Sequence, residues 1–512
     1  MSQRDLSMDI IQLPFNFSAT NFLLFSSFIF LLIITKLWKK TKRYQNLPPS
    51  PPTLPVIGHL HHLLGGLPHH ALRRVTQKYG PVVHLRTGQV SVVVISSRQA
   101  AKEVLKNQDP ACADRPQSIG LKIMWYNYTN IAFSPYNEYW RQMRKICILE
   151  LLSAKNVRSF GSIRQDEASC LLRSLRSGEA VDLTAKINTF ISSITCRATF
   201  GKVVRDREAL LAMLKKAVVM AGGFDVADFF PSSNLLYALS WNRHKLLRMR
   251  RKVDAILDGI LEEYKLKQSG DQLGSEDILD VLLRMQKNEE LEFPITNDTI
   301  KAVIFDMFSA GTETSSTLLD WTMAELMRNP RVMAKAQADI REAFKGKKTI
   351  EESDIHALKY LKLVIKETLR LHPPSPLLLR ACRDECKANG YSIPLKSKVL
   401  VNIWSMGRDP EYWPEPETFR PERFENSTVD FLGNHFEFIP FGSGKRICPG
   451  INFAFANVEL PLALLLYHFD WEMPKGMKAP DDIDMTEVAG ISALRKVHLF
   501  LVPIAYEPST QN

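Results

Sequence analysis

Cysteine is sparse in this sequence, whose 512 residues include only seven. The number is odd and the spacing irregular, which excludes the paired disulfide framework of small secreted proteins. Cys382 and Cys386 could supply half of a zinc site, but no second pair of cysteines follows at zinc-like spacing. Most of the chain is therefore predicted to reside in a reducing compartment.

The sequence also lacks internal repeats, low-complexity tracts and long basic runs. Its net charge is +11, but residues 44–512 contain 60 basic and 53 acidic residues, a mild excess of +7. No nucleic-acid-binding motif accompanies this excess, so we predict no nucleic-acid partner. A basic face for an acidic protein partner or an anionic membrane is the better interpretation.

Charge is absent from residues 10–35, and residues 22–34 (FLLFSSFIFLLII) are almost wholly apolar. Extended back to residue 15, this run reaches the roughly 20 residues that span a bilayer core. The basic cluster directly after it predicts that the rest of the chain faces the cytosol. We therefore expect a short lumenal N-terminus (1–14), a transmembrane anchor (15–35) and a basic stop-transfer segment with a proline-rich hinge (36–57). A cleaved signal peptide is the alternative, but its charges should precede the apolar run.

Residues 58–512 are predicted to form one cytosolic domain, mainly α-helical with small β-sheets, because no second linker interrupts them. Helical patterns cover residues 243–267, 303–327 and 354–371, and strand patterns cover residues 81–97, 398–403 and 497–502. The apolar, loop-like residues 224–239 form either a buried connection or a second membrane contact or substrate gate.

Trp140 and Arg144 lie one helical turn apart, so an indole N–H and a guanidinium can grip one carboxylate. An exposed amphipathic helix is the alternative interpretation. Glu367 and Arg370 are spaced to pair on another helix between apolar segments, and Arg423 is available as a third member. We predict that this partly buried network locks the fold and does not catalyse.

Residues 310–316, AGTETSS, lie in a long apolar helix. The small pair Ala310 and Gly311 allows a flat group to approach the backbone, while Glu313 and Thr314 add an acid and a hydroxyl. Polar groups in such surroundings are costly unless they are hydrogen-bonded. The Thr314 hydroxyl either bonds back to its own helix or holds a water and relays a proton.

Residues 440–450, PFGSGKRICPG, set one cysteine in an unusual place. Gly442 and Gly444 permit tight turns. Pro449 suits the first turn of the apolar helix that follows, so Cys448 is predicted at a helix N-terminus, where a thiolate is stabilised. Such a thiolate is a nucleophile or a metal ligand. No motif supplies a histidine base for a nucleophile, whereas a haem iron needs no second protein ligand.

Taken together and in this order, the motifs resemble those of the cytochrome P-450 family, the haem-thiolate monooxygenases. They are W-R-x-x-R, A-G-x-E-T, E-x-x-R, P-E-R-F and F-x-x-G-x-R-x-C-x-G, at residues 140–144, 310–314, 367–370, 421–424 and 441–450. The resemblance extends from about residue 48 to the C-terminus and implies the cytochrome P-450 fold. The anchor and the hinge resemble those of microsomal plant members.

The resemblance implies haem b as the cofactor, with Cys448 as the iron ligand and Phe441 packed near it. It also implies charge-assisted bonds to the haem propionates from four residues, namely Trp140, Arg144, Arg380 and Arg446. The chain departs from the family pattern at residues 379–381, where Leu-Arg-Ala stands in place of the usual Pro-Arg-Glu. This departure bears on Arg380 and on the pocket around it.

Thr314 with Glu313 would, by the same resemblance, deliver protons through water as general acids. Residues 119–126, 304–310, 375–379 and 491–493 would line the substrate pocket, and they are mainly aliphatic and aromatic. Several segments are similar to those of the plant subfamily that oxidises terpenoids and indole alkaloids.

We therefore expect a single-pass protein of the endoplasmic reticulum membrane that hydroxylates or epoxidises a bulky apolar metabolite, a terpenoid or an indole alkaloid, with O2. Electrons would come from NADPH through a membrane-bound reductase docked on the basic side near Cys448, with cytochrome b5 as a further partner. One alternative is a haem-thiolate isomerase or dehydratase that needs no reductase. The other is a non-enzymatic haem-binding membrane protein.

Overall fold

The computed structural model describes residues 26–27, 46–204, 207–222, 225–267, 276–288, 291–347, 350–477, 479–488 and 490–507. The chain divides into two units, Met1–Gln45 and Asn46–Asn512. The predicted lumenal segment lies outside the described residues, as does the predicted anchor apart from Ser26 and Ser27. The second unit carries everything that follows.

Helices make up most of this unit. The α-helices are α2 (Pro68–Tyr79), α3 (Arg98–Lys102), α4 (Ile119–Met124), α5 (Glu138–Ile146), α6 (Ala154–Ser159), α7 (Gly161–Arg173), α8 (Leu183–Phe200), α9 (Arg207–Gly222), α10 (Val226–Phe229), α11 (Asn234–Leu239), α12 (Trp241–Lys267), α13 (Ile278–Gln286), α14 (Asn297–Arg328), α15 (Pro330–Ala343), α16 (Lys359–Leu371), α17 (Ile403–Met406) and α18 (Ile451–His468). Shorter 3-10 or π turns are η1 (Leu60–Leu63), η2 (Glu103–Asn107), η3 (Asp109–Cys112), η4 (Tyr126–Tyr128), η5 (Cys147–Leu151), η6 (Glu352–Ala357), η7 (Pro421–Phe424), η8 (Gly444–Arg446) and η9 (Pro480–Asp482).

The strands form small sheets, as predicted. They are β1 (Val82–Thr87), β2 (Val90–Ile95), β3 (Val181–Asp182), β4 (Leu377–Ala381), β5 (Cys386–Ala388), β6 (Tyr391–Ile393), β7 (Lys398–Asn402), β8 (Phe469–Glu472) and β9 (Phe500–Ala505). Within the described residues the sheet orders are β1-β2-β7-β4, β3-β9-β8 and β5-β6. Only the pairing of β2 with β7 is parallel among these described strands.

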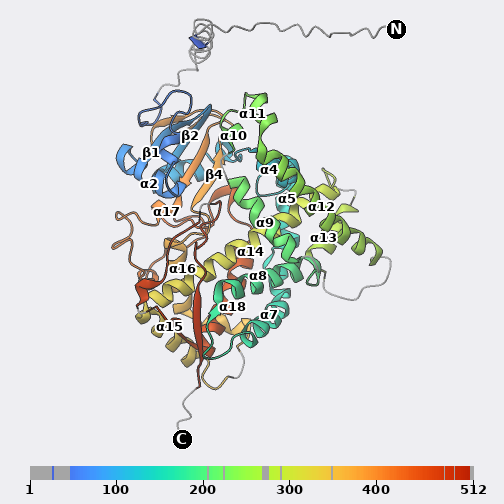
Figure 1. Cartoon of the computed structure of the whole chain (residues 1–512), viewed down its shortest axis with the longest axis vertical. Coiled ribbons are helices and arrows are strands. Elements are labelled where there is room, and N and C mark those ends of the chain that lie inside the picture. The colour runs from blue at the N-terminus through green and yellow to red at the C-terminus, as the bar shows by residue number, and fades with distance from the viewer. Residues whose placement is uncertain are drawn as a thin grey trace, which may run out of the picture. The chain divides into compact units, whose positions relative to one another are not determined.

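Helix α14 passes through the middle of the helical part, and α8 and α18 pack against it (Figure 1). The Thr296 side chain caps its start by accepting a hydrogen bond from the Thr299 amide. Most of its residues are buried, which explains a helix that is apolar around most of its circumference. Helix α18 is the one described helix long and apolar enough to cross a bilayer, but it belongs to the same buried core.

Most predicted elements are confirmed, with shifted ends. Residues 243–267 and 303–327 lie in α12 and α14, and residues 81–97 contain the β1–β2 hairpin. The helix predicted over 354–371 is interrupted, because Leu358 takes a non-helical ψ of 82° between η6 and α16. Strand β9 begins three residues later than the predicted start at residue 497.

Residues 46–57, the end of the predicted hinge, are hydrogen-bonded to the folded body. The Pro49 carbonyl accepts a hydrogen bond of 2.9 Å from the His84 amide in β1. Gly58 has φ +64°, and a Cβ there would lie 2.0 Å from the Arg86 carbonyl oxygen, so only glycine fits this close approach. Residues 46–57 therefore belong to the same compact unit as the residues that follow them.

Two short helices, α10 and α11, occupy the region predicted to be loop-like at residues 224–239. Val226, Leu235 and Leu239 are 59%, 67% and 69% exposed. The described part of this region is therefore not a buried connection, which was one of the two interpretations.

Candidate active site

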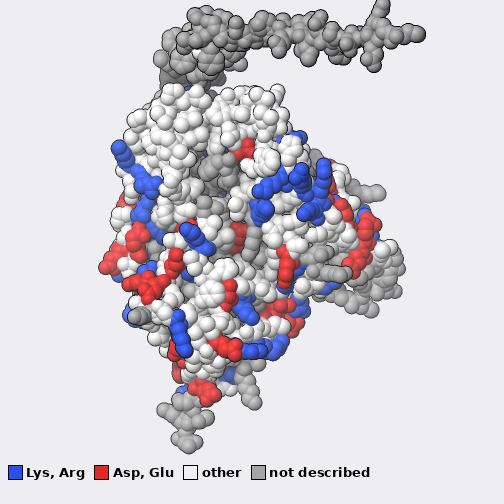
Figure 2. All heavy atoms as spheres, in the orientation of Figure 1, with Lys and Arg blue, Asp and Glu red and all other residues white. Residues whose placement is uncertain are grey.

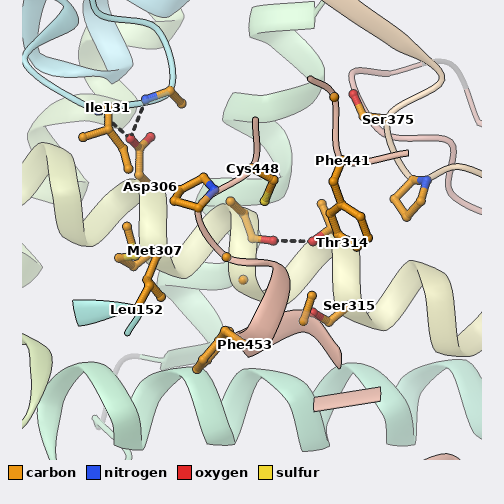
Figure 3. A pocket seen from close by; sticks show the side chains of 18 of the residues that line it. Ile131, Leu152, Asp306, Met307, Thr314, Ser315, Ser375, Phe441, Cys448 and Phe453 are labelled. Carbon is orange, nitrogen blue, oxygen red and sulfur yellow. Dashed lines mark hydrogen bonds between the residues drawn. The ribbon is translucent and has the colours of Figure 1, made fainter. Parts of the chain in front are cut away.

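A cavity of about 330 Å³ lies among α14, the start of α18 and the loop before α18 (Figure 3). Cys448 enters it from the loop and Thr314 from α14. Figure 3 shows Phe441 beside Cys448, and Asp306, Met307, Thr314 and Ser315 in order along α14. The two features predicted from separate motifs thus meet in one cavity.

The loop around Cys448 is held by its own backbone. The Cys448 amide donates a hydrogen bond of 2.9 Å to the Phe441 carbonyl. Gly442 and Gly444 have φ +75° and +69°, which confirms the predicted tight turns. A Cβ at Gly444 would lie 2.2 Å from the Leu105 carbonyl oxygen, so this glycine also permits the loop to touch η2.

Helix α18 begins at Ile451 with Gly450 as its N-cap, so Pro449 precedes the helix and does not occupy its first turn as predicted. Burial raises the pKa of the Cys448 thiol, while the Gly450 N–H and the Arg144 charge lower it. Burial is the largest of these effects. The helix end alone therefore does not make a stable thiolate, and a cation bound at the sulfur would supply what is missing.

Four guanidinium groups line the cavity, and we call them the cavity arginines: Arg115, Arg144, Arg380 and Arg446. Arg380 comes from β4 and Arg446 from η8. Their hydrogen bonds go to backbone carbonyls, such as Arg380 Nη2 to Ser443 at 2.8 Å and Arg446 Nε to Ala113 at 2.8 Å. The departure from the family pattern at residues 379–381 does not remove Arg380 from the site.

No ion pair joins the cavity arginines to a carboxylate within the described part of the chain. Burial, together with the charges of neighbouring arginines, lowers the pKa of Arg380 to about 10 and that of Arg446 to about 9. The buried Arg380 Nη1 has no hydrogen-bond partner. Buried cations without counter-charges are costly, so this group fits an anionic ligand with at least two acceptors.

Trp140 contacts two of the cavity arginines but does not itself line the cavity. Its indole N–H donates a hydrogen bond of 3.0 Å to the Ile131 carbonyl, so this donor is not available to a ligand in the cavity. The guanidinium of Arg446 lies 4.1 Å from the centre of the indole ring, and that of Arg144 lies 5.3 Å from it. Trp140 thus orients two cavity arginines by cation–π contact.

Arg115 lies outside every predicted segment of the site, and Asp306 was expected only as part of the pocket segment 304–310. Arg115 Nε donates a hydrogen bond of 2.9 Å to the Ala132 carbonyl. Asp306 is buried and accepts hydrogen bonds of 2.9 and 3.0 Å from the Ile131 and Ala132 amides. Burial raises the pKa of Asp306 to about 6. Asp306 could have been found from the sequence, because an aspartate inside an apolar helical stretch is unusual. Arg115 is an isolated arginine, and nothing in the sequence around it indicates a role in the site.

The Thr314 hydroxyl donates a hydrogen bond of 2.6 Å to the Ala310 carbonyl one turn earlier (Figure 3). This is the back-bonded arrangement, yet the hydroxyl oxygen still lines the cavity and can accept a hydrogen bond. Ser315 Oγ, also in the lining, is buried without a partner. Glu313 is 9% exposed and lies outside the lining. The structure therefore brings Thr314 to the cavity and not Glu313.

Gly311 lines the cavity, but its small size also serves the packing of α14 on α18. A Cβ at this position would lie 3.2 Å from the Phe453 ring and 3.6 Å from Thr195. The small residues at 310–311 were predicted to let a flat group approach the backbone. At Gly311 the small size also lets α18 pack closely against α14.

The predicted Glu367 network, consisting of Glu367, Arg370 and Arg423, is confirmed away from the cavity. Arg370 donates two hydrogen bonds of 2.8 Å to the carboxylate, and Arg423 Nε donates one of 2.9 Å. The Glu367 and Arg370 side chains are fully buried. The motif locks α16 to η7, as a structural role requires.

The predicted pocket segments divide into two groups. Residues 304–310 and 375–379 contribute to the lining, but residues 119–126 and 491–493 do not. Met124 and Trp125 are instead buried in the main core, and the Ala493 carbonyl accepts a hydrogen bond of 2.8 Å from the Trp321 indole. Their apolar side chains are used for packing.

Comparison with known families gives one clear match. The family model described as Cytochrome P450 matches residues 48–499. Cytochrome P450 71D13 of Mentha piperita is 61% identical over 94% of this chain and 96% of its own length. Premnaspirodiene oxygenase of Hyoscyamus muticus is 54% identical over 97% of this chain and 99% of its own length.

The fold agrees with that match. A solved structure of a zebra fish cytochrome P450 with progesterone covers 86% of this chain and all of its own chain, with a TM-score of 0.74 and 24% identity. At that identity the likeness concerns the fold alone. The shared fold is the one described above for this chain, a helical body with small sheets.

Proposed function

The chain belongs to the cytochrome P450 family, and we propose that it hydroxylates or epoxidises a bulky apolar terpenoid. As a member it is a haem-thiolate monooxygenase that receives electrons from a reductase and acts on a hydrophobic substrate. The observation that carries the site assignment is the single cavity that joins the Cys448 thiol, the Thr314 hydroxyl and four arginines without carboxylate partners.

Haem b, when bound, supplies the activation of O2. The residues fit this group: Cys448 would hold the iron, and the cavity arginines would hold the two propionates. The pairing would give the buried Arg380 Nη1 the partner that it lacks. Phe441 would pack beside the sulfur and Trp140 would orient Arg144 and Arg446. Arg115 joins the ligands that we expected from the sequence.

Thr314 would hold and pass a proton at Oγ1. Its hydroxyl hydrogen is donated to Ala310, so the oxygen would accept a hydrogen bond from a water that enters the cavity. Ser315 Oγ offers a second position for the same water chain. We propose Glu313 as the acid that replenishes the proton from outside the lining. Apolar side chains around them exclude bulk water from the reacting carbon.

The substrate class rests on the lining and on the relatives. Apart from the arginines and Asp306, the wall is largely aliphatic or aromatic, and it includes Leu152, Met307 and Phe453. One similar protein is named for oxygenation of premnaspirodiene. A terpenoid is therefore the first candidate and an indole alkaloid the second.

The bilayer is proposed as a partner on two grounds. Residues 15–35 have the composition of an anchor, followed by basic residues that favour a cytosolic body. The exposed Leu235 and Leu239 of α11 lie on a surface with few charged side chains, which Figure 2 shows over β1, β2 and α11. An exposed apolar patch of this kind fits lipid. The endoplasmic reticulum is the proposed location.

The electron donors are proposed to dock near Cys448. Lys145 and Lys445 are exposed, one directly after Arg144 and the other three residues before Cys448. Their charges suit the acidic surface of a flavoprotein reductase or of cytochrome b5.

The test is turnover of the full chain in lipid nanodiscs with plant reductase, NADPH and a panel of terpenoid hydrocarbons and indole alkaloids, under isotopically labelled O2. We expect a mono-oxygenated terpenoid that carries the label and forms only with NADPH. Product without NADPH and without label would favour an isomerase or dehydratase. A haem-loaded protein that shows neither product nor a spectral shift with any compound would favour a non-enzymatic role.

A further inference from the structure

Three cysteines from distant parts of the chain meet outside the active-site cavity. Cys112 ends η3, Cys382 follows β4 and Cys386 begins β5. The sulfur of Cys112 lies 2.8 Å from that of Cys386 and 3.2 Å from that of Cys382, and the last two sulfurs are 3.6 Å apart. None of the three lines the active-site cavity. We call them the thiol cluster.

The thiol cluster is buried in a second, smaller core. The three residues are 1%, 2% and 4% exposed, and their neighbours in that core are mainly alanine, valine, leucine and isoleucine side chains. A single cysteine in such a place is a small hydrophobe. Two of the three separations, 2.8 and 3.2 Å, are shorter than the roughly 3.5–4.0 Å at which even carbon atoms make relaxed contact. A group bound by all three sulfurs would offset that crowding.

A disulfide is a poor answer, because it would join two sulfurs and leave the third without a partner. It would also require an oxidising compartment, contrary to the prediction from cysteine usage. A bound cation uses all three. No histidine or carboxylate belongs to the group among the described residues, so the donor set is sulfur alone.

We propose that Cys112, Cys382 and Cys386 form a closed, three-thiolate site for monovalent copper. Soft thiolate ligands select soft ions such as Cu(I) and disfavour magnesium, calcium and manganese. Structural zinc sites need four ligands, and only three are present among the described residues of this group.

The backbone holds the sulfurs together before any ion arrives. The Ala381 amide donates a hydrogen bond of 2.8 Å to the Asp114 carbonyl, and the Arg383 amide donates one of 2.9 Å to the Ala111 carbonyl. These bonds flank Cys112 on one segment and Cys382 on the other.

The site would link two segments that carry cavity arginines. Arg115 lies three residues after Cys112, and Arg380 lies two residues before Cys382. Copper bound at the thiol cluster would therefore clamp one segment to the other, and we expect it to raise the thermal midpoint of the holoenzyme.

The experiment loads the purified haem-containing full chain with Cu(I) under argon in the presence of a competing Cu(I) chelator. After desalting, copper and iron are measured together. We expect one copper for each haem iron. Serine substitution of Cys112, Cys382 or Cys386 should weaken copper binding at least about tenfold, since even outer-shell changes cost that much in metal sites. Cys170→Ser, at an exposed cysteine outside the cluster, is the matched control and should bind as the unaltered chain does.

Three results would overturn the proposal: no copper retained by the unaltered holoenzyme, undiminished binding in a variant with all three cysteines replaced, or a disulfide within the cluster in freshly isolated protein. X-ray absorption at the copper edge, on the unaltered chain alone, gives a test that does not depend on the folding of variants. Three sulfur neighbours are expected there, and nitrogen or oxygen neighbours would contradict the assignment.

Discussion

Two groups of buried arginines use opposite solutions to the same electrostatic problem. In the Glu367 network, Arg370 and Arg423 share the carboxylate of Glu367. The cavity arginines form no ion pair with a carboxylate in the described part of the chain, and burial and neighbouring arginine charges lower the pKa of Arg115 and of Arg380. One group is therefore complete when the chain folds, and the other is complete only with an anion that the chain does not supply.

The difference shows how a binding site is distinguished from a structural network of similar composition. A buried charge is tolerable when it is paired and costly when it is not. Burial and mutual repulsion lower the pKa of Arg446 to about 9, which records this cost. We propose that the two propionates of haem would offset two of these four positive charges.

Removal of the carboxylate from the complete group should have the largest effect. Glu367→Ala would leave Arg370 and Arg423 as uncompensated buried cations, so we expect a loss of about 3–5 kcal/mol in the free energy of unfolding. Chemical denaturation and haem content measure this. Glu138→Ala is the control, because its pair with Arg141 is half exposed and should cost less than about 1 kcal/mol. Equal stability of the two variants would show that the network is superficial.

Removal of a cation from the incomplete group should affect the ligand more than the fold. Arg380→Met would relieve repulsion in the apoprotein, so its free energy of unfolding should stay the same or rise. Haem affinity should fall by about 1.5–3 kcal/mol, the worth of a charged hydrogen bond. Haem transfer to a scavenging protein reports the affinity. An apoprotein destabilised as strongly as Glu367→Ala would abolish the distinction between the two groups.

The pH dependence of stability tests whether Asp306 is ionised and acts as a counter-charge to the cavity arginines. The pKa of Asp306 in the folded chain is about 6, raised by burial, against an ordinary value near 3.8. A raised carboxyl pKa stabilises the fold at low pH and this contribution is lost as pH rises through the folded value. The stability advantage of the apoprotein over its Asp306→Asn variant should therefore shrink between about pH 4 and 6 and stay level above that range, because the carboxyl is then ionised in both the folded and the unfolded chain. An advantage that grows with pH would mean that Asp306 acts as an ionised partner of the arginines.

Thr314→Ala should have a small effect on stability and a clear one on chemistry. Its loss removes one hydrogen bond, worth about 1 kcal/mol, but should raise the peroxide released for each NADPH consumed. Thr317→Ala is the control, because Thr317 makes the same 2.6 Å bond to the preceding turn and lies outside the cavity. Equal coupling in both variants would remove Thr314 from the proton path.

The sequence predicted the parts of the site that short motifs encode. Cys448, Thr314, Arg144 and the pair of Glu367 with Arg370 follow from spacing within one element or one loop. Arg380 was also found, and the unusual residues beside it did not displace it, because its register in β4 is fixed by pairing with Val399 in β7.

The features that the sequence could not predict depend on contacts between distant segments. Arg115 reaches the cavity because η3 packs beside the Cys448 loop, where Asp109 accepts a hydrogen bond from the Lys445 amide. The thiol cluster unites residues 112, 382 and 386 in the same way. Conversely, residues 119–126 and 491–493 were expected in the pocket but mostly pack in the core. Apolar composition alone cannot distinguish a core residue from one that lines a cavity.

The most direct test of Cys448 as the iron ligand is the carbon monoxide spectrum of the reduced holoprotein with and without the Cys448 sulfur. We predict the thiolate-type spectrum for the unaltered chain and for Cys170→Ser, and its loss in Cys448→Ser. A thiolate-type spectrum that persists in Cys448→Ser would place the iron ligand elsewhere and contradict the assignment.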